Sequence, residues 1–132
     1  MNGFHANITH LTATNGNFRQ VIYTGKNTQL VLMSIEPAGE ISAEIHPEND
    51  QFFHFESGEG LVIIDSNEYD VSAGSAIIVP AGAEHTVINV SDTDPLQLYT
   101  LYSPPHHKDG ATHATIEDAI ADDEDFDGTT TE

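Results

Sequence analysis

One glutamate, one glutamine and two histidines are spaced so that they could form a metal site. Glu44 and His46 are two positions apart, and residues i and i+2 lie on the same face of a β-strand. Gln51 begins the next extended segment, and His85 begins a later one directly after a turn. If these segments face one another, two imidazoles and one carboxylate supply most of the ligands of a first-row transition metal. The amide oxygen of Gln51 would then be a fourth, neutral and weaker ligand.

The elements that must position these side chains are short β-strands. Apolar or alternating segments are separated by turn signals at close spacing, which predicts a sandwich or a barrel. The expected strands are Phe18–Thr24, Gln29–Ile35, Ser42–His46, Gln51–Glu56, Leu61–Ile64, Glu68–Val71, Ala76–Val79, Glu84–Val90 and Leu96–Tyr102. The only helix that the pattern favours spans Thr115–Ala121, with Thr115 as its N-cap and acidic residues in its first turn.

The chain of 132 residues is long enough for one domain. We expect an N-terminal segment over residues 1–16, a folded body over 17–104, and a C-terminal loop with an acidic tail over 105–132. Pro104 and Pro105 end the regular strand pairing.

The region around His85 carries a highly specific motif. Gly74 is followed after five residues by Pro80, then by Gly82, by His85 after two more residues, and by Asn89 after three more. This arrangement resembles the second motif of the cupin family, G(x)5PxG(x)2H(x)3N, at every position.

The region around His46 resembles the first cupin motif, G(x)5HxH(x)3,4E(x)6G, in its second half. His46, Gln51 and Gly58 have the spacing of that half. Glu44 stands where the family has its first histidine, Gln51 stands where it has glutamate, and Gly39 is one residue closer than the pattern asks. The strings HPENDQFFHFESGEG and LQLYTLYSPPHHKDG look like the small single-domain cupins described as mannose-6-phosphate-isomerase-like.

The resemblance implies an all-β fold, a double-stranded β-helix or jelly-roll barrel, with a metal near one mouth. By position, Glu44, His46, Gln51 and His85 would be its ligands. Type I mannose-6-phosphate isomerases bind zinc with one glutamine, one glutamate and two histidines, so the ligand types agree while two places are exchanged. Zinc, manganese and iron all stay open as the metal. Analogy with small cupins also implies a homodimer.

The remaining histidines have less to do with a metal. His54 lies three residues after Gln51, so it points to the opposite face of the strand. His5 and His10 lie in a polar segment and are expected to be solvated. His106, His107 and His113 follow the last strand, in a loop that could fold over the barrel mouth and supply a pocket wall or an acid–base group, which the sequence leaves open. By parity, one of Tyr99 and Tyr102 faces the interior.

The composition excludes several classes of protein. The 22 acidic residues against 3 basic ones give a charge of −19, which disfavours binding to a nucleic-acid backbone or to an anionic membrane. Without cysteine there is no disulfide, thiolate–metal site or thiol nucleophile. The first residues show no basic and apolar signal sequence, so we expect a cytoplasmic protein.

The acidic residues have two interpretations. Residues 117–132 contain 8 of them and no basic residue, which is typical of a disordered acidic tail. The other 14 acidic residues lie outside this tail, together with all 3 basic ones. Adaptation to high salt, as in a halophilic protein, therefore explains the composition better, because salt screens the repulsion.

Three functions remain open. A divalent metal with one carboxylate ligand polarises carbonyls, which favours an isomerase or epimerase acting on a sugar or similar oxygen-rich small molecule. In that case Glu84 or a histidine of the late loop would move a proton. The alternatives are an iron- or manganese-dependent dioxygenase and a non-catalytic module that binds metal and a small molecule. A phosphate on the ligand would need Arg or Lys, and only Arg19 and Lys108 could reach a mouth.

Overall fold

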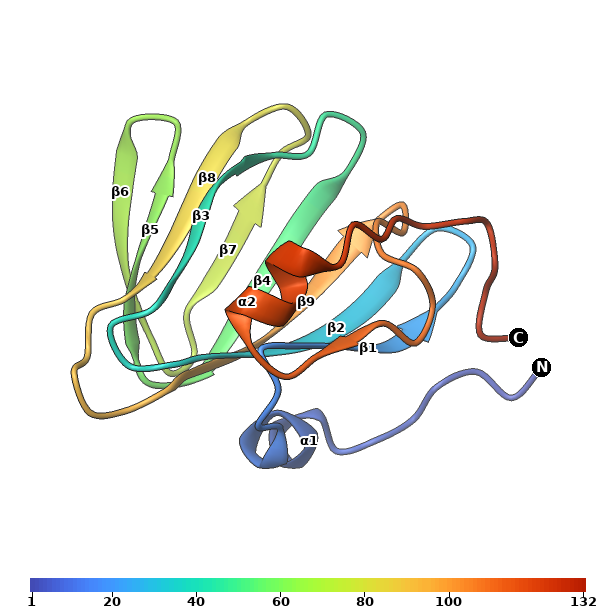
Figure 1. Cartoon of the computed structure of the whole chain (residues 1–132), viewed down its shortest axis with the longest axis horizontal. Helices are drawn as coiled ribbons and strands as arrows, with labels where there is room; N and C mark the ends of the chain where they lie inside the picture. Colours follow the sequence, from blue (N-terminus) through green and yellow to red (C-terminus); the bar gives the residue numbers. More distant parts are fainter.

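The computed structural model describes all 132 residues, and two antiparallel β-sheets enclose its core (Figure 1). The six-stranded sheet has the order β10-β1-β2-β9-β4-β7, and the four-stranded sheet has the order β3-β8-β5-β6. The strands are β1 (Arg19–Thr24), β2 (Gln29–Ile35), β3 (Glu40–Ile45), β4 (Asp50–Ser57), β5 (Glu59–Ile64), β6 (Asn67–Ser72), β7 (Ala76–Val79), β8 (Glu84–Asn89), β9 (Leu96–Ser103) and β10 (Thr112–His113). The two helices are α1 (Ile8–Thr14) and α2 (Ile116–Ala121). This architecture confirms the all-β jelly-roll that the motifs predict.

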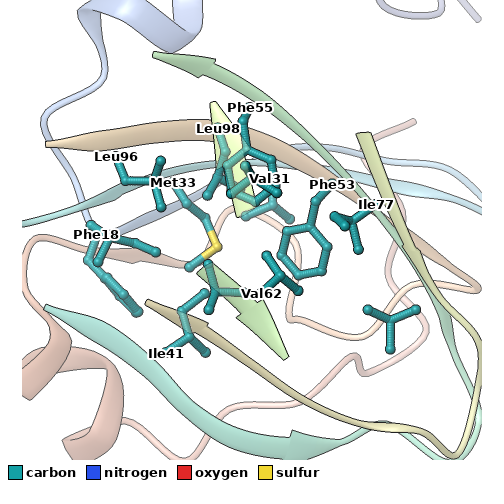
Figure 2. Packing of buried hydrophobic residues seen from close by; sticks show 14 of the residues in the cluster. Phe18, Val31, Met33, Ile41, Phe53, Phe55, Val62, Ile77, Leu96 and Leu98 are labelled. Carbon is teal, nitrogen blue, oxygen red and sulfur yellow. The ribbon is translucent and has the colours of Figure 1, made fainter. Parts of the chain in front are cut away.

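The core lies between the sheets and follows from the two-residue period of the strands (Figure 2). In β4, Gln51, Phe53 and Phe55 point inward and are buried, whereas Phe52 and His54 lie on the outer face and are half-buried. Figure 2 shows Phe53 and Phe55 packed among aliphatic side chains such as Val31. The inward face of β4 is therefore apolar except at its first inward position, which is Gln51.

A bulge in β3 turns Glu44 toward the interior. Ile41 pairs with Val87 and Glu44 pairs with His85, so β3 has one residue more than β8 between these pairs. Without the extra residue, Ile41 and Glu44 would lie on opposite faces, because an odd number of positions separates them. A bulge shifts the phase of the strand and redirects the following side chain. Both Ile41 and Glu44 consequently face inward.

The strand predictions agree with the structure, with every boundary within two residues. Helix α2 is also confirmed, and the Thr115 side chain accepts a hydrogen bond from the Asp118 amide as its N-cap. Two elements were missed. Helix α1 is capped by Asn7 but carries no apolar stripe, and the two-residue strand β10 exists only because it pairs with β1.

The acidic tail lies against the body of the protein. Its last residue, Glu132, accepts hydrogen bonds from Tyr23 and from the Gly3 amide, and the Thr131 amide donates to Thr24. Figure 1 shows the two termini ending near each other beside the β1–β2 end of the larger sheet. The disordered-tail interpretation is therefore replaced by a docked segment. Neither helix of the structure is long and apolar enough to cross a membrane.

Asn89, the last residue of the second motif, holds three chain segments together. Its Nδ2 donates to the carbonyls of Ile35, Glu36 and Asp94, and its Oδ1 accepts from the Ser91 amide. The side chain is 2% exposed, its bond to Ile35 is buried and its other three bonds are partly buried, so removing the amide would leave these groups without this partner. Asn89 thus acts in the fold and takes no part in a site.

We expect Asn89→Ala to lower the free energy of unfolding by about 2–4 kcal/mol, because buried carbonyls lose their donor. Chemical denaturation measures this change. Asn67→Ala is the matched control, since Asn67 is exposed and makes one 3.3 Å hydrogen bond to Ile64. Equal stability of the two variants would contradict the role assigned to Asn89.

Candidate metal centre

The side chains of Glu44, His46 and His85 converge inside the barrel. One ligand atom from each lies within 4.8 Å of the others. The Glu44 Oε2 atom is 3.1 Å from His46 Nε2 and 3.9 Å from His85 Nε2. These are the residues whose convergence the spacing predicts, and the group could hold a metal ion.

Three pieces of backbone fix this arrangement. Glu44 and His85 are directly opposite each other on β3 and β8, where cross-strand side chains are close. His46 follows β3, and its carbonyl accepts a hydrogen bond from the Gly82 amide at 3.0 Å. Gly82 has a φ of 90°, a left-handed conformation that favours glycine. The motif spacing between Gly82 and His85 therefore has a structural reason: the turn at Gly82 holds the chain next to His46.

Gln51 approaches from the other sheet. It is 3% exposed and lies on β4, opposite Tyr102 of β9. Its Nε2 donates to the Thr100 hydroxyl at 3.1 Å, while its Oε1 has no hydrogen-bond partner. The bond to Thr100 orients the amide so that the oxygen is the free atom.

The buried atoms without partners match a metal-ligand set. His46 Nε2, His85 Nε2 and Gln51 Oε1 all lack a hydrogen bond and are inaccessible to solvent. Buried polar atoms are normally satisfied, because leaving one unpaired is costly. A divalent metal accepts lone pairs from imidazole nitrogens, carboxylates and amide oxygens, so the residues present fit such an ion.

The electrostatics favour the ligand forms of these groups. Burial raises the pKa of Glu44, but the His46 ring 3.1 Å away and the nearby charges of Arg19 and His85 together outweigh that effect, so the pKa lies below its ordinary value. Burial, together with the neighbouring His46, lowers the pKa of His85. An ionised carboxylate and a neutral imidazole are the forms that coordinate metals.

His106 covers one side of the centre. Its ring lies 4.3 Å from the His46 ring and stacks on Tyr102 at 5.3 Å. The buried Gln29 holds this loop, because its Oε1 accepts from the amides of both His106 and His107. Burial, reinforced by His107, lowers the pKa of His106 to about 4.

A hydrogen-bonded chain leads from the interior to the acidic tail. The Tyr102 hydroxyl is 3.2 Å from His107 Nε2, and His107 Nδ1 is 2.6 Å from Glu124 Oε1. The other Glu124 oxygen accepts from the Lys108 amide. Burial raises the pKa of Tyr102 and lowers that of His107. Tyr102, and not Tyr99, is therefore the inward tyrosine.

A cavity of about 230 Å³ opens beside the centre. Glu44 and Arg19 line it from β3 and β1, and Ile116 and Ala119 of α2 form another wall. Figure 1 shows α2 in front of the gap between β3 and the β1–β2 pair. Arg19 reaches this mouth as expected, whereas Lys108 is exposed and lines a separate acidic depression with Asp122.

Other predicted side chains lie away from the centre. Glu84 is exposed on the outer face of β8, because it alternates with the buried His85, so it is not the proton-moving group. His54 lies on the outer face beside Glu56, as expected. His5 and His10 are exposed.

His113 was expected in a loop over the mouth but lies in β10. It pairs with Arg19 across β10 and β1 and is buried. Its Nε2 is 2.8 Å from an oxygen of Asp122.

A family model described as a cupin domain matches residues 31–102, which is more than half of the chain. The chain belongs to the cupin family. The matched residues include both motifs, the group of Glu44, His46 and His85, and Gln51.

This cupin is similar to proteins from several organisms. It is 43% identical over 124 residues to the uncharacterized protein YrkC of Bacillus subtilis, an alignment that covers 89% of this chain and 66% of YrkC. It is 39% identical to BH2720 of Bacillus halodurans, whose crystal structure matches with a TM-score of 0.88 over 90% of this chain and 94% of that chain. An RmlC-like cupin from Shewanella frigidimarina shares the fold at 22% identity and a TM-score of 0.60, with 69% and 79% of the two chains covered. The chain spans about two thirds of the length of YrkC.

The sequence of this cupin did not predict the hydrogen bonds that link Tyr102, His107 and Glu124. The late-loop histidines were noticed, but nothing in local spacing relates Glu124 to His107, since 17 positions separate them. In the sequence, nothing distinguishes Glu124 from the other acidic residues of the tail, because its contact with His107 forms only when the tail packs against the body.

We expect this cupin to lose stability as the pH falls, in two stages. Burial lowers the pKa of His107, so below about pH 6.5 the unfolded chain takes up a proton that the folded chain excludes. Burial raises the pKa of Glu124, but its hydrogen bonds with His107 and the Lys108 amide and the nearby charges of His107 and Arg19 together lower it by more. Its contribution to stability is therefore present above its unfolded pKa and disappears as the pH falls through the folded value.

Glu124→Gln should remove the second stage and lower stability at pH 8 by about 1 kcal/mol, because the histidine loses an ionised, partly solvated partner. Urea denaturation from pH 8 down to about pH 2 covers both stages. Asp123→Asn is the control, since Asp123 is exposed. Identical pH profiles for Glu124→Gln and the wild type would show that the tail contact contributes nothing.

Proposed function

We propose that this cupin is a metal-dependent enzyme that binds a small oxygen-rich molecule and moves a proton on it, as sugar isomerases and epimerases do. The proposal rests on one observation above the others. Two imidazoles and one carboxylate converge beside a cavity that Glu44 lines, and the buried Gln51 amide oxygen has no hydrogen-bond partner.

A divalent metal bound by Glu44, His46, His85 and Gln51 would act as a Lewis acid that polarises a substrate carbonyl and stabilises an enediolate. Glu44 and the two histidines would hold it from the smaller sheet and its edge, and Gln51 from the larger one. The apolar side chains Phe53 and Phe55 behind Gln51 keep that side dry, which strengthens electrostatic interactions.

His106 is the best-placed group for moving a proton. Its ring lies against His46, and its side chain makes none of the hydrogen bonds that occupy His107. The Gln29 side chain holds the backbone of His106 by accepting a hydrogen bond from its amide. A positioned imidazole with a free nitrogen is the commonest general acid or base in proteins.

The dioxygenase is the second candidate, and the ligand types favour it. Two histidines and one carboxylate are the set used by non-haem iron oxygenases, which keep open positions for oxygen. The amide oxygen of Gln51 argues the other way, because it would take one of those positions. The identity of the metal distinguishes the two candidates.

We expect protein purified without chelators to contain close to one equivalent of metal, and the His46→Ala, His85→Ala variant to contain almost none. Plasma mass spectrometry measures this directly. His5→Ala, His10→Ala is the matched control, because it removes two exposed histidines far from the centre.

Zinc or manganese, with proton exchange into a panel of sugars and keto sugars, would support the isomerase. Iron together with oxygen consumption would replace it with the dioxygenase. If removing the metal changes none of the measured activities, the protein would be a non-catalytic module that binds metal. Equal metal in both double variants would contradict the assigned centre.

Thr100→Val should weaken the affinity for metal by roughly 10- to 100-fold, because Gln51 loses the hydroxyl that orients its amide. Competition with a chromogenic chelator measures the affinity. Thr86→Val is the control, since Thr86 lies on the outer face of β8 next to His85. An unchanged affinity in Thr100→Val would remove Gln51 from the ligand set.

A further inference from the structure

Arg19 is a buried cation without a partner. It is 8% exposed, and its Nε has no hydrogen bond. All five ion pairs of the structure involve histidine, so none includes Arg19. A guanidinium carries five N–H donors and is always charged, and a buried charge without a partner is unfavourable. In a chain with 22 acidic and 3 basic residues, a buried cation that no carboxylate has paired with needs an explanation.

The position of Arg19 is fixed by the fold. Its backbone lies in β1 between β10 and β2, opposite His113 and Met33. Its guanidinium carbon lies 5.3 Å above the centre of the Phe18 ring, within the range of a cation–π contact. The structure shows no hydrogen bond from the Nε of Arg19 and no ion pair to its guanidinium, and a guanidinium can bind a planar anion through two parallel N–H donors.

Arg19 lines the cavity beside the metal centre. Arg19 and Glu44 line the same cavity, and the charge of Arg19 contributes to lowering the pKa of Glu44. The volume of about 230 Å³ is smaller than that of pockets for drug-sized ligands. Phe18, Ile41 and Ile116 make the middle of the cavity apolar.

We infer that Arg19 is the anion subsite of this cavity, and that the ligand is a small monocarboxylic acid whose carboxylate binds the guanidinium while a carbonyl or hydroxyl oxygen at its other end reaches the metal centre. The metal end of this assignment rests on the proposed function, whereas the carboxylate end does not. The structure thereby narrows the substrate from oxygen-rich molecules in general to organic acids.

A carboxylate fits better than a phosphate. Only one cationic side chain lines the cavity, and the carboxylates of Glu40 and Glu44 line it too. A dianion would be repelled by both of them, whereas a monoanion is matched by one guanidinium. The apolar wall then contacts the carbon chain between the two polar ends of the ligand.

Levulinate, a 4-oxo acid with its carboxylate and ketone at opposite ends, is the probe. Its affinity is measured by calorimetry at about 0.5 M potassium chloride, where surface charge is screened. Arg19→Gln should bind levulinate roughly 10- to 100-fold more weakly than the wild type, because a charged hydrogen bond is lost. Lys26→Gln is the matched control, since it removes the same charge from an exposed turn and should leave the affinity unchanged.

Two further ligands define the class. Levulinamide, the neutral analogue, should bind wild type and Arg19→Gln equally. Inorganic phosphate should bind more weakly than levulinate. Tighter binding of phosphate, or equal binding of levulinate to wild type and Arg19→Gln, would overturn the inference.

The Nε–Hε resonance of Arg19 in wild-type protein provides a readout that needs no variant. It should shift on titration with levulinate in metal-free protein as well as in metal-loaded protein. If the resonance shifts with levulinate but the protein binds no metal at any site, the proposed metalloenzyme is rejected and the carboxylate subsite at Arg19 is retained. Metal binding with no shift of this resonance would reject the subsite alone.

Arg19→Gln should unfold at the same temperature as the wild type or higher, since no partner is lost, and a large drop in the unfolding temperature would make Arg19 a structural residue instead.

Discussion

The structure depends on polar atoms that are buried at one point between two apolar sheets without hydrogen-bond partners. The nitrogens of His46 and His85 meet the Glu44 carboxylate there, and the buried oxygen of Gln51 on the facing sheet has no hydrogen-bond partner. Burial without a partner is unfavourable, and a divalent metal ion binds donor atoms of these types. The protein accepts this local cost because the surrounding core is well packed, with Phe53, Phe55 and Val62 fully buried.

The two sheets contribute different parts of the centre, so its geometry depends on how they are tied together. The bulge in β3 turns Glu44 inward, the β3–β8 register places it opposite His85, and the Gly82 amide holds the chain at His46. Thr100 and Gln29 then orient Gln51 and the His106 loop from the larger sheet. The acidic tail extends this order outward, because Glu124 holds His107, which in turn contacts Tyr102. Arg19 is the one charged side chain at the mouth that none of these contacts satisfies.

Much of this could be predicted from the sequence, and the failures have physical causes. The strands were predictable because apolar alternation is local, and His46 and His85 because their motifs fix turns on either side. The bulge between Ile41 and Glu44 could not be predicted from the sequence. The spacing of Glu44 and His46 places these two on one face of a strand with or without a bulge before them. Glu84 was one of two alternatives for moving a proton, but as the neighbour of His85 in the strand it lies on the opposite, exposed face. Strand β10 and the Glu124 contact are long-range, so no local signal indicates them.

We propose that one metal ion lies between Glu44, His46, Gln51 and His85. Anomalous diffraction at the zinc edge, from crystals of zinc-loaded protein, would locate this ion. We expect a single strong peak about 2.0–2.2 Å from the nitrogens of both histidines and from an oxygen of Glu44, with Gln51 Oε1 as the fourth neighbour. A barrel without such a peak, with zinc bound only to carboxylates of the acidic tail, would contradict it.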